Sequence, residues 1–171
     1  MLRPSPANPG GLALYAGIED RPAKQRNLAR YLFLHPNARE LSATERDLQI
    51  RGCVGRLRAL AGTNPEAPTP PDLTNLVGEL LLKSADFAKL WDRYDVTGRK
   101  NTTKTFHHPH VGAITHGFQG MSLESTPGQR MAIYVAEPGT PDHDAMLLLD
   151  MTAPQHTSTT PPGQSTQEPR G

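Results

Sequence analysis

The chain has 171 residues, and its 18 Lys and Arg against 17 Asp and Glu give a formal net charge of +1. This balance neither attracts the chain to a phosphate backbone nor repels it, which argues against nucleic-acid binding by this chain alone. Its lone cysteine, Cys53, cannot form an internal disulfide. The N-terminus lacks a signal-peptide pattern, and no apolar run approaches the roughly 20 residues needed to cross a bilayer. We therefore expect a soluble, cytoplasmic protein without a membrane partner.

Proline and glycine mark the ends of one expected domain. Residues 1–11 combine Pro, Gly and polar residues, so they are predicted to be a flexible leader. Residues 152–171 contain no large apolar residue and are predicted to be a disordered tail. The domain is therefore expected to span residues 12–151.

Two helices are predicted near the start of this domain. The first begins near Arg26, and Pro36 ends it because the residue before a proline leaves the helical region. The second is expected to run from Asn37 to Gly62, with Asn37 as its cap and Glu40 three residues later.

A loop with four prolines, residues 62–71, separates these helices from two more. Asp72 is expected to cap a helix whose leucines follow the spacing of one buried face. Ser84 is expected to cap the next, which carries aromatic residues on one face. That face is either core packing or the wall of a pocket; its members are Phe87, Leu90, Trp91 and Tyr94.

After Val96 the β-branched and aromatic content rises, and four short strands are predicted near 102–107, 111–117, 119–124 and 130–136. In the last strand Met131, Ile133 and Val135 alternate with their neighbours, as in a sheet with one buried face. Short connections favour an antiparallel meander. A final helix is expected from about Pro141 to Met151. The order of elements predicts an α+β fold.

Four separated segments resemble the MmyB-like ligand-binding domain of bacterial transcription regulators, in order and in approximate spacing. They are RNLARYLFLHPNAR (26–39), LVGELLLKSADFAKLWDRYDV (76–96), KTFHHPHVG (104–112) and IYVAEPGTPDHDAMLLL (133–149). The resemblance implies a PAS-like fold, with a helical N-terminal half packed on a small meander and a closing C-terminal helix. It also implies sensing of a small apolar ligand, such as a fatty acid.

In that family the domain follows an XRE-type helix-turn-helix. The residues before Arg26 are too few for one and show no paired helical pattern. DNA contact is therefore expected only through a domain missing from this chain.

A ligand-binding site between the helices and the sheet is predicted from these patterns. Apolar pockets are lined mostly by hydrophobic side chains with a few placed polar groups. The predicted wall residues are Phe33, Phe87, Trp91, Tyr94, Phe106, Met121 and Tyr134. A fatty-acid carboxylate would also need a cation or donor. The candidates for this role are Arg30, Arg93, Lys104 and His108.

The histidines near the first hairpin offer an alternative. His108 and His110 would share a face of a regular strand and His116 could join them, which gives three nitrogen ligands for zinc. Pro109 argues against that regularity, so no metal or other cofactor is expected. The chain also lacks the motifs of nucleophilic, phosphate-binding and metalloprotease sites, so it is not expected to be an enzyme.

We expect a sensor domain of a transcription regulator, in which the ligand shifts an existing equilibrium of helix packing. One alternative is a stand-alone interaction module that pairs with a second copy or with a full-length regulator. Another is a regulator whose DNA-binding half is encoded upstream of Met1.

Overall fold

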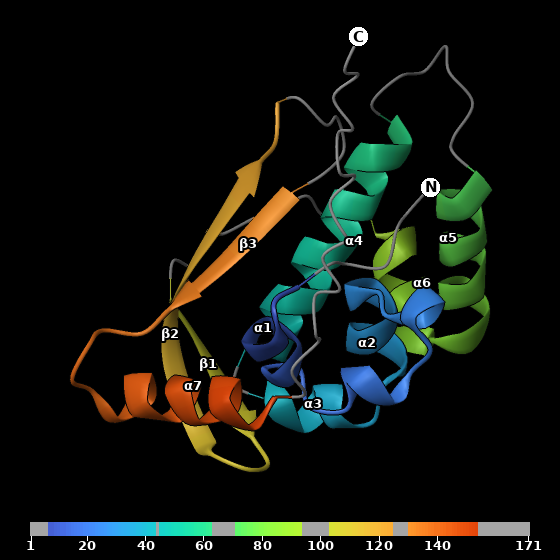
Figure 1. The fold of residues 1–171 in the computed structure, drawn as a ribbon. Helices are drawn as coiled ribbons and strands as arrows, with labels where there is room; N and C mark the ends of the chain where they lie inside the picture. The colour runs from blue at the N-terminus through green and yellow to red at the C-terminus, as the bar shows by residue number, and fades with distance from the viewer. Residues whose placement is uncertain (1–6, 44, 63–70, 94–102, 125–129, 154–171) are drawn as a thin grey trace, which may run out of the picture.

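In the computed structural model the helices of the N-terminal half lie on one side and a small sheet on the other, with the last helix beside the sheet (Figure 1). The structure describes residues 7–43, 45–62, 71–93, 103–124 and 130–153. Within these ranges, six α-helices precede three strands and one α-helix follows them. The predicted α+β class, with a helical N-terminal half and a closing helix, is confirmed.

The first helix, α1 (Pro9–Ala13), begins inside the stretch 1–11 predicted as a leader. It buries Leu12 and packs against the closing helix of the fold. Gly10 permits this contact, because a Cβ at its position would lie 2.5 Å from the Asp150 Oδ1 atom. The closing helix, which is distant in sequence, thus holds α1 in place.

Of the three predicted caps in the N-terminal half, only Ser84 is confirmed. Asn37 is the first residue of its helix, which follows Pro36 without a side-chain cap, and Asp72 lies in the first turn of a helix that begins at Pro71. Two short 3-10 turns, η1 (Ile18–Asp20) and η2 (Ala23–Gln25), lead into the other helices of this half. The Ser84 hydroxyl accepts a hydrogen bond from the Phe87 amide, as predicted for the start of an aromatic helix. These helices are α2 (Leu28–Leu34), α3 (Asn37–Leu41), α4 (Arg46–Gly62), α5 (Pro71–Lys83) and α6 (Ala85–Asp92).

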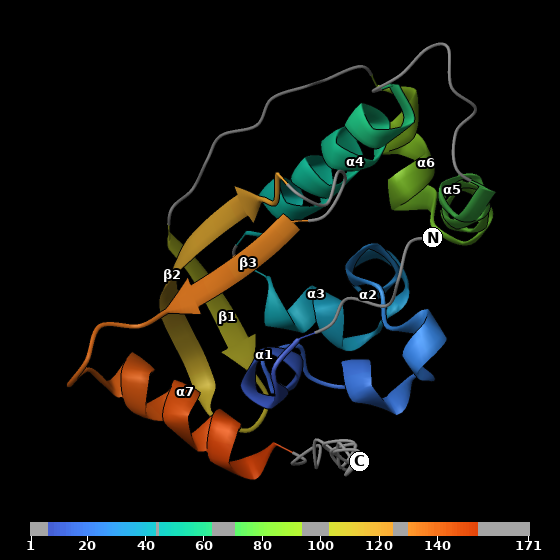
Figure 2. The ribbon, with the colours of Figure 1, turned by 45° about the horizontal axis from the view of Figure 1, so that its top comes forward.

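The prediction of one helix from Asn37 to Gly62 is wrong, because the chain turns after α3. Ser42 is buried at this turn, and its hydroxyl donates a hydrogen bond to the Ala38 carbonyl. A serine side chain that bonds the backbone in this way competes with helix continuation. The break lets α4 run in a new direction, with its N-terminal end toward the sheet (Figure 2).

The strands β1 (Thr103–His108), β2 (Gly112–Ser122) and β3 (Arg130–Val135) form an antiparallel sheet in the order β1-β2-β3. The predicted meander is therefore confirmed in direction and order.

Its strand number differs from the prediction, because the segments 111–117 and 119–124 belong to one strand. Gly117 pairs with Thr103 on one side and with Val135 on the other. Two neighbouring strands thus hold this glycine in the ladder, where a glycine in isolation would weaken the strand.

The closing helix α7 (Pro141–Thr152) crosses the sheet end and reaches α1 (Figure 2). The Asp142 carboxylate accepts a hydrogen bond of 2.8 Å from the Thr115 amide, which ties α7 to β2. Leu149 enters the core from the other end of the helix. Among the described residues, no helix combines the length and the apolar character that a membrane crossing requires.

Candidate ligand-binding site

Alternate residues of the sheet point toward the helices and form its inner face. They are Lys104, Phe106, His108, Ile114, His116, Phe118 and Tyr134. The central members Phe106, Ile114 and His116 are at most 1% exposed. The face is therefore a mostly aromatic wall that also carries one amine and two imidazoles.

Tyr15, from the segment after α1, covers this wall. Its ring centroid lies 5.7 Å from that of Phe106 and 6.1 Å from that of Tyr134. The Tyr15 and Tyr134 hydroxyls hydrogen-bond to each other. Burial raises the pKa of both phenols, so each remains neutral at ordinary pH. Tyr15 is absent from the predicted site because it has no periodic pattern around it.

Lys104 brings a cation onto the wall. Its Nζ lies 3.6 Å from the centroid of the Phe118 ring and 5.9 Å from that of Tyr134. None of the ion pairs among the described residues involves this amine. Burial lowers the pKa of Lys104 to about 8, with a further lowering by Arg56 that Glu45 opposes. The amine is thus a partly desolvated cation beside aromatic rings.

One face of α4 lies opposite Lys104. Glu45 stands just before the helix, Gln49 follows one turn later, and Arg56 lies two turns beyond on the same side. The charges of Glu45 and Arg56 both act on Lys104. Arg56 also acts on the Tyr15 and Tyr134 hydroxyls. The side chains of α4 and the sheet therefore meet in a mixed polar and aromatic layer.

Several buried polar atoms in this layer have no hydrogen-bond partner among the described residues. They are Glu45 Oε2, Gln49 Nε2 and both ring nitrogens of His116. The Ile114 backbone also acts on the His116 ring, in the direction that raises its pKa. Burial lowers the pKa of His116 to about 4, so its imidazole is neutral at neutral pH. Buried polar atoms in native proteins are nearly always paired. This concentration of unpaired atoms singles out the layer as a place for a polar ligand group.

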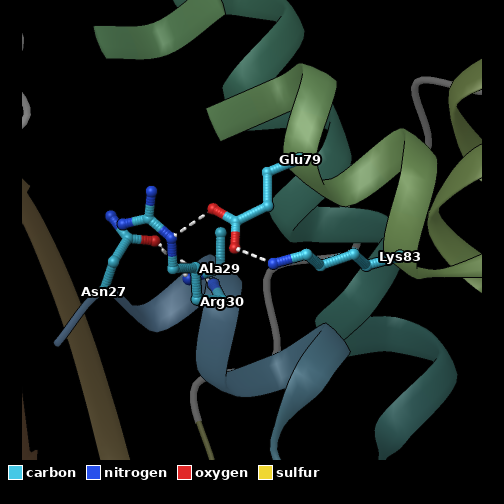
Figure 3. A network of polar contacts seen from close by, with 5 residues as sticks. All are labelled: Asn27, Ala29, Arg30, Glu79 and Lys83. Carbon is cyan, nitrogen blue, oxygen red and sulfur yellow. Dashed lines mark hydrogen bonds and ion pairs between the residues drawn. The ribbon is translucent and has the colours of Figure 1, made fainter. Parts of the chain in front are cut away.

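The larger of the two cavities described for the fold, about 430 Å³, lies on the helical side between η1, α2 and α5. Arg30, a predicted carboxylate partner, lines it. Figure 3 shows the Arg30 Nε atom and the Lys83 Nζ atom converging on the Glu79 carboxylate, at 2.8 and 3.0 Å. The cations at Arg30 and Lys83 are already paired with Glu79. Arg21 also lines this cavity.

The smaller cavity, about 180 Å³, lies between α1, the β1–β2 turn and α7. His108, another predicted carboxylate partner, lines it. Its Nε2 is 3.0 Å from the Ala13 carbonyl, and its Nδ1 accepts a hydrogen bond from the His110 amide. Both ring nitrogens therefore bond to the backbone, which makes His108 a connector of α1 to the turn.

Three predicted wall residues form a separate aromatic group on the helical side. Phe87 contacts Phe33 edge to face at 5.0 Å and stacks on Trp91 at 5.4 Å between ring centroids. Arg58 lies over the Trp91 ring at 5.2 Å. Arg93, just after α6, is exposed. The prediction for Tyr94 falls outside the described residues.

Met121 lies on the sheet face opposite Tyr134 and is 37% exposed. From the predicted set, the structure therefore brings Phe106, Tyr134, Lys104 and His108 onto one sheet face, although both His108 nitrogens bond to the backbone. It places the other described members elsewhere. The polar members that the sequence did not reveal, Glu45 and Gln49, lie one turn apart at the start of α4. Polar residues on a buried helix face are a usable signal, but that face is known only from the structure.

The three histidines of the first hairpin that were considered as zinc ligands do not lie on one sheet face. His108 and His116 are buried on the inner face, and His110 is exposed in the turn. Within the ranges that the structure describes, no three His, Cys, Asp or Glu side chains gather as a metal site would require.

The family model for the MmyB-like transcription regulator ligand binding domain matches residues 5–149. This match covers the helical half, the sheet and most of α7. No curated protein matches the chain significantly.

Proposed function

Because the chain belongs to the family of MmyB-like transcription regulator ligand binding domains, we propose that it senses a small apolar acid, such as a fatty acid, on the inner face of the sheet. The ligand would lie between α4 and the wall that contains Phe106 and Tyr134, where its acid group faces Lys104. The observation that carries this proposal is the amine of Lys104, which stands on an aromatic wall and takes part in none of the ion pairs among the described residues.

The chemistry of the wall suits an amphiphilic ligand. Aromatic rings offer rigid apolar area to an acyl chain, and a desolvated cation pairs strongly with a carboxylate. A carboxylate also stabilises the charged form of Lys104, whose pKa burial has lowered to about 8. Ligand binding would therefore offset the desolvation of this amine.

Transmission of the signal is proposed to pass through the segment after α1. Tyr15 bonds to Tyr134 on the sheet and contacts Tyr31 of α2 edge to face at 5.5 Å. A ligand that enters the wall competes with this packing and changes how α1 and α2 sit on the sheet. It acts as a signal if it binds one packing more tightly than the other.

The proposal is tested with purified protein and saturated fatty acids from octanoic to hexadecanoic acid. At least one acid should raise the melting temperature, and native mass spectrometry should show a bound molecule. The Lys104→Met variant should lose most of this shift. Lys89→Met, a matched change on the exposed side of α6, should keep it. Absence of any shift, together with absence of bound lipid, rejects the proposed ligand class.

A second candidate function, association with another copy of the chain, is favoured by the outer face of the sheet. Three apolar side chains of β3 lie there; Met131, Ile133 and Val135 are 45%, 36% and 57% exposed. Such a patch on an edge strand is typical of an interface. Light scattering coupled to size exclusion tests it: the Val135→Lys variant should be monomeric where the wild type is a dimer. A monomeric wild type at high concentration rejects this candidate.

A further inference from the structure

The unpaired polar atoms between α4 and the sheet carry information about the head group of the ligand. Lys104 and His116 are cross-strand partners on the inner face. The charge of Glu45 acts on Lys104, and the charge of Lys104 acts on His116. Gln49 follows Glu45 by one helical turn. The four side chains therefore belong to one layer.

The unpaired atoms of this layer include both hydrogen-bond donors and hydrogen-bond acceptors. The Gln49 amide nitrogen is a donor, and a neutral imidazole at His116 supplies one donor and one acceptor. Glu45 Oε2 is an acceptor. These atoms have no partner among the described residues. A group that only accepts hydrogen bonds would leave the acceptor Glu45 Oε2 unpaired.

The cation of the layer is Lys104, whose amine takes part in none of the ion pairs among the described residues. Glu45 and the exposed Arg56 act on Lys104 with opposite signs, and Asp142 acts on His116 from α7 while it accepts a hydrogen bond from the Thr115 amide. A carboxylate on the ligand gives the Lys104 amine a partner of opposite charge.

We propose that the ligand is a hydroxylated acid, whose carboxylate meets Lys104 and Gln49 and whose hydroxyl bonds to Glu45 and His116. This inference rests on the proposed function and narrows its ligand class from acids in general to amphiphiles with a hydroxyl beside the acid group. The carboxylate accepts from the amine and the amide. The hydroxyl donates to Glu45 Oε2 and accepts from the N–H of His116.

Discrimination follows from the cost of an unpaired buried group. A site built to bond a hydroxyl disfavours the analogue that lacks it, because its own polar groups stay unpaired. A hydroxylated acid is therefore expected to bind at least about tenfold more tightly than the plain acid of equal chain length. A methyl ester should bind most weakly, because it lacks the charge that Lys104 needs.

The test compares dodecanoic acid, its α-hydroxy and β-hydroxy forms, and methyl dodecanoate by titration calorimetry. One hydroxy acid should bind at least about tenfold more tightly than dodecanoic acid. His116→Phe and Gln49→Met should each reduce this preference toward unity, while melting curves report whether they fold. Gln119→Met, the same change on the exposed outer side of β2, should retain the preference.

The outcomes separate this inference from the proposed function. Equal binding of plain and hydroxylated acids overturns the inference that the ligand carries a hydroxyl group. The proposed function, sensing of a fatty acid, then stands. A preference that persists in both His116→Phe and Gln49→Met also overturns it, because the hydroxyl is then bound elsewhere. Failure of all four compounds to bind overturns this inference together with the proposed function.

Discussion

The hydroxyl groups of Tyr15 and Tyr134 hydrogen-bond to each other although 119 residues separate them in the chain. This bond joins the segment after α1 to the C-terminal end of β3. The two rings also meet nearly at right angles, with centroids 6.1 Å apart. The N-terminal segment is therefore an integral part of the wall on which we propose that the ligand binds.

Removal of either hydroxyl should destabilise the domain. Tyr134→Phe leaves the Tyr15 hydroxyl buried without its partner, which is expected to lower the free energy of unfolding by about 1–3 kcal/mol. Urea denaturation at neutral pH measures this loss. The double variant with Tyr15→Phe should lose less than the sum of the two single losses, because both remove one shared bond.

Additive losses would mean that the two hydroxyls do not depend on each other. Tyr31→Phe provides the comparison, since the Tyr31 hydroxyl donates to the Ala16 carbonyl instead. In the double variant of Tyr31→Phe and Tyr134→Phe, the two losses of unfolding free energy should be almost additive.

Acid should destabilise the fold through His116. Burial lowers its pKa from 6.5 to about 4, so the unfolded chain takes up a proton at a higher pH than the native protein does. The stability linked to this imidazole is full above about pH 6.5 and is lost as the pH falls toward 4, by up to about 3 kcal/mol.

Denaturation of wild type and of His116→Phe over that pH range isolates this contribution. His35 and His108 also have a pKa lowered by burial, so they act in the same direction in both proteins. The variant should show the weaker pH dependence. Parallel curves for the two proteins would contradict a buried neutral imidazole.

The local sequence pattern was sufficient to predict most of the helices and strands. The leucine stripe of α5 predicts both the helix and its buried side, and Leu73, Leu76 and Leu80 are indeed buried. A helix repeats every 3.6 residues, so spacing alone identifies its inward face. The cap at Ser84 is equally local.

Contacts between distant segments were not accessible in this way. In β3 the alternation predicts a strand, yet Met131, Ile133 and Val135 lie on the exposed side. Tyr134 faces inward beside Phe118, and its hydroxyl meets Tyr15, a partner that no local pattern reveals. The same holds for the approach of Glu45 to Lys104, and so the polar half of the candidate site could not be predicted.

The ion pair between Arg30 and Glu79 should contribute to the packing of α2 on α5 (Figure 3). Glu79→Gln is expected to lower the free energy of unfolding by about 0.5–1 kcal/mol, and less at high salt. Asp47→Asn, which breaks a pair within α4 whose carboxylate is 73% exposed, should have a smaller effect.

The pH dependence of the same pair provides a second readout. The hydrogen bond from Arg30 is the main cause that lowers the pKa of Glu79 below 4.5. The stability due to the pair is therefore present above about pH 4.5 and is lost as the pH falls through the folded-state value. Equal acid sensitivity of wild type and Glu79→Gln would contradict this contribution.

Gly17 should tolerate no side chain. Its φ is 82°, in the left-handed region, and a Cβ there would lie 2.7 Å from the His35 Cε1 atom. Gly17→Ala is therefore expected to destabilise the domain by about 1–2 kcal/mol from the backbone alone, measured as a lower melting temperature. Gly52→Ala is the control of opposite sign: it lies within α4 with no atom near its Cβ position, and it should stabilise by about 0.5–1 kcal/mol. If both variants melted above the wild type, the left-handed conformation at Gly17 would be excluded.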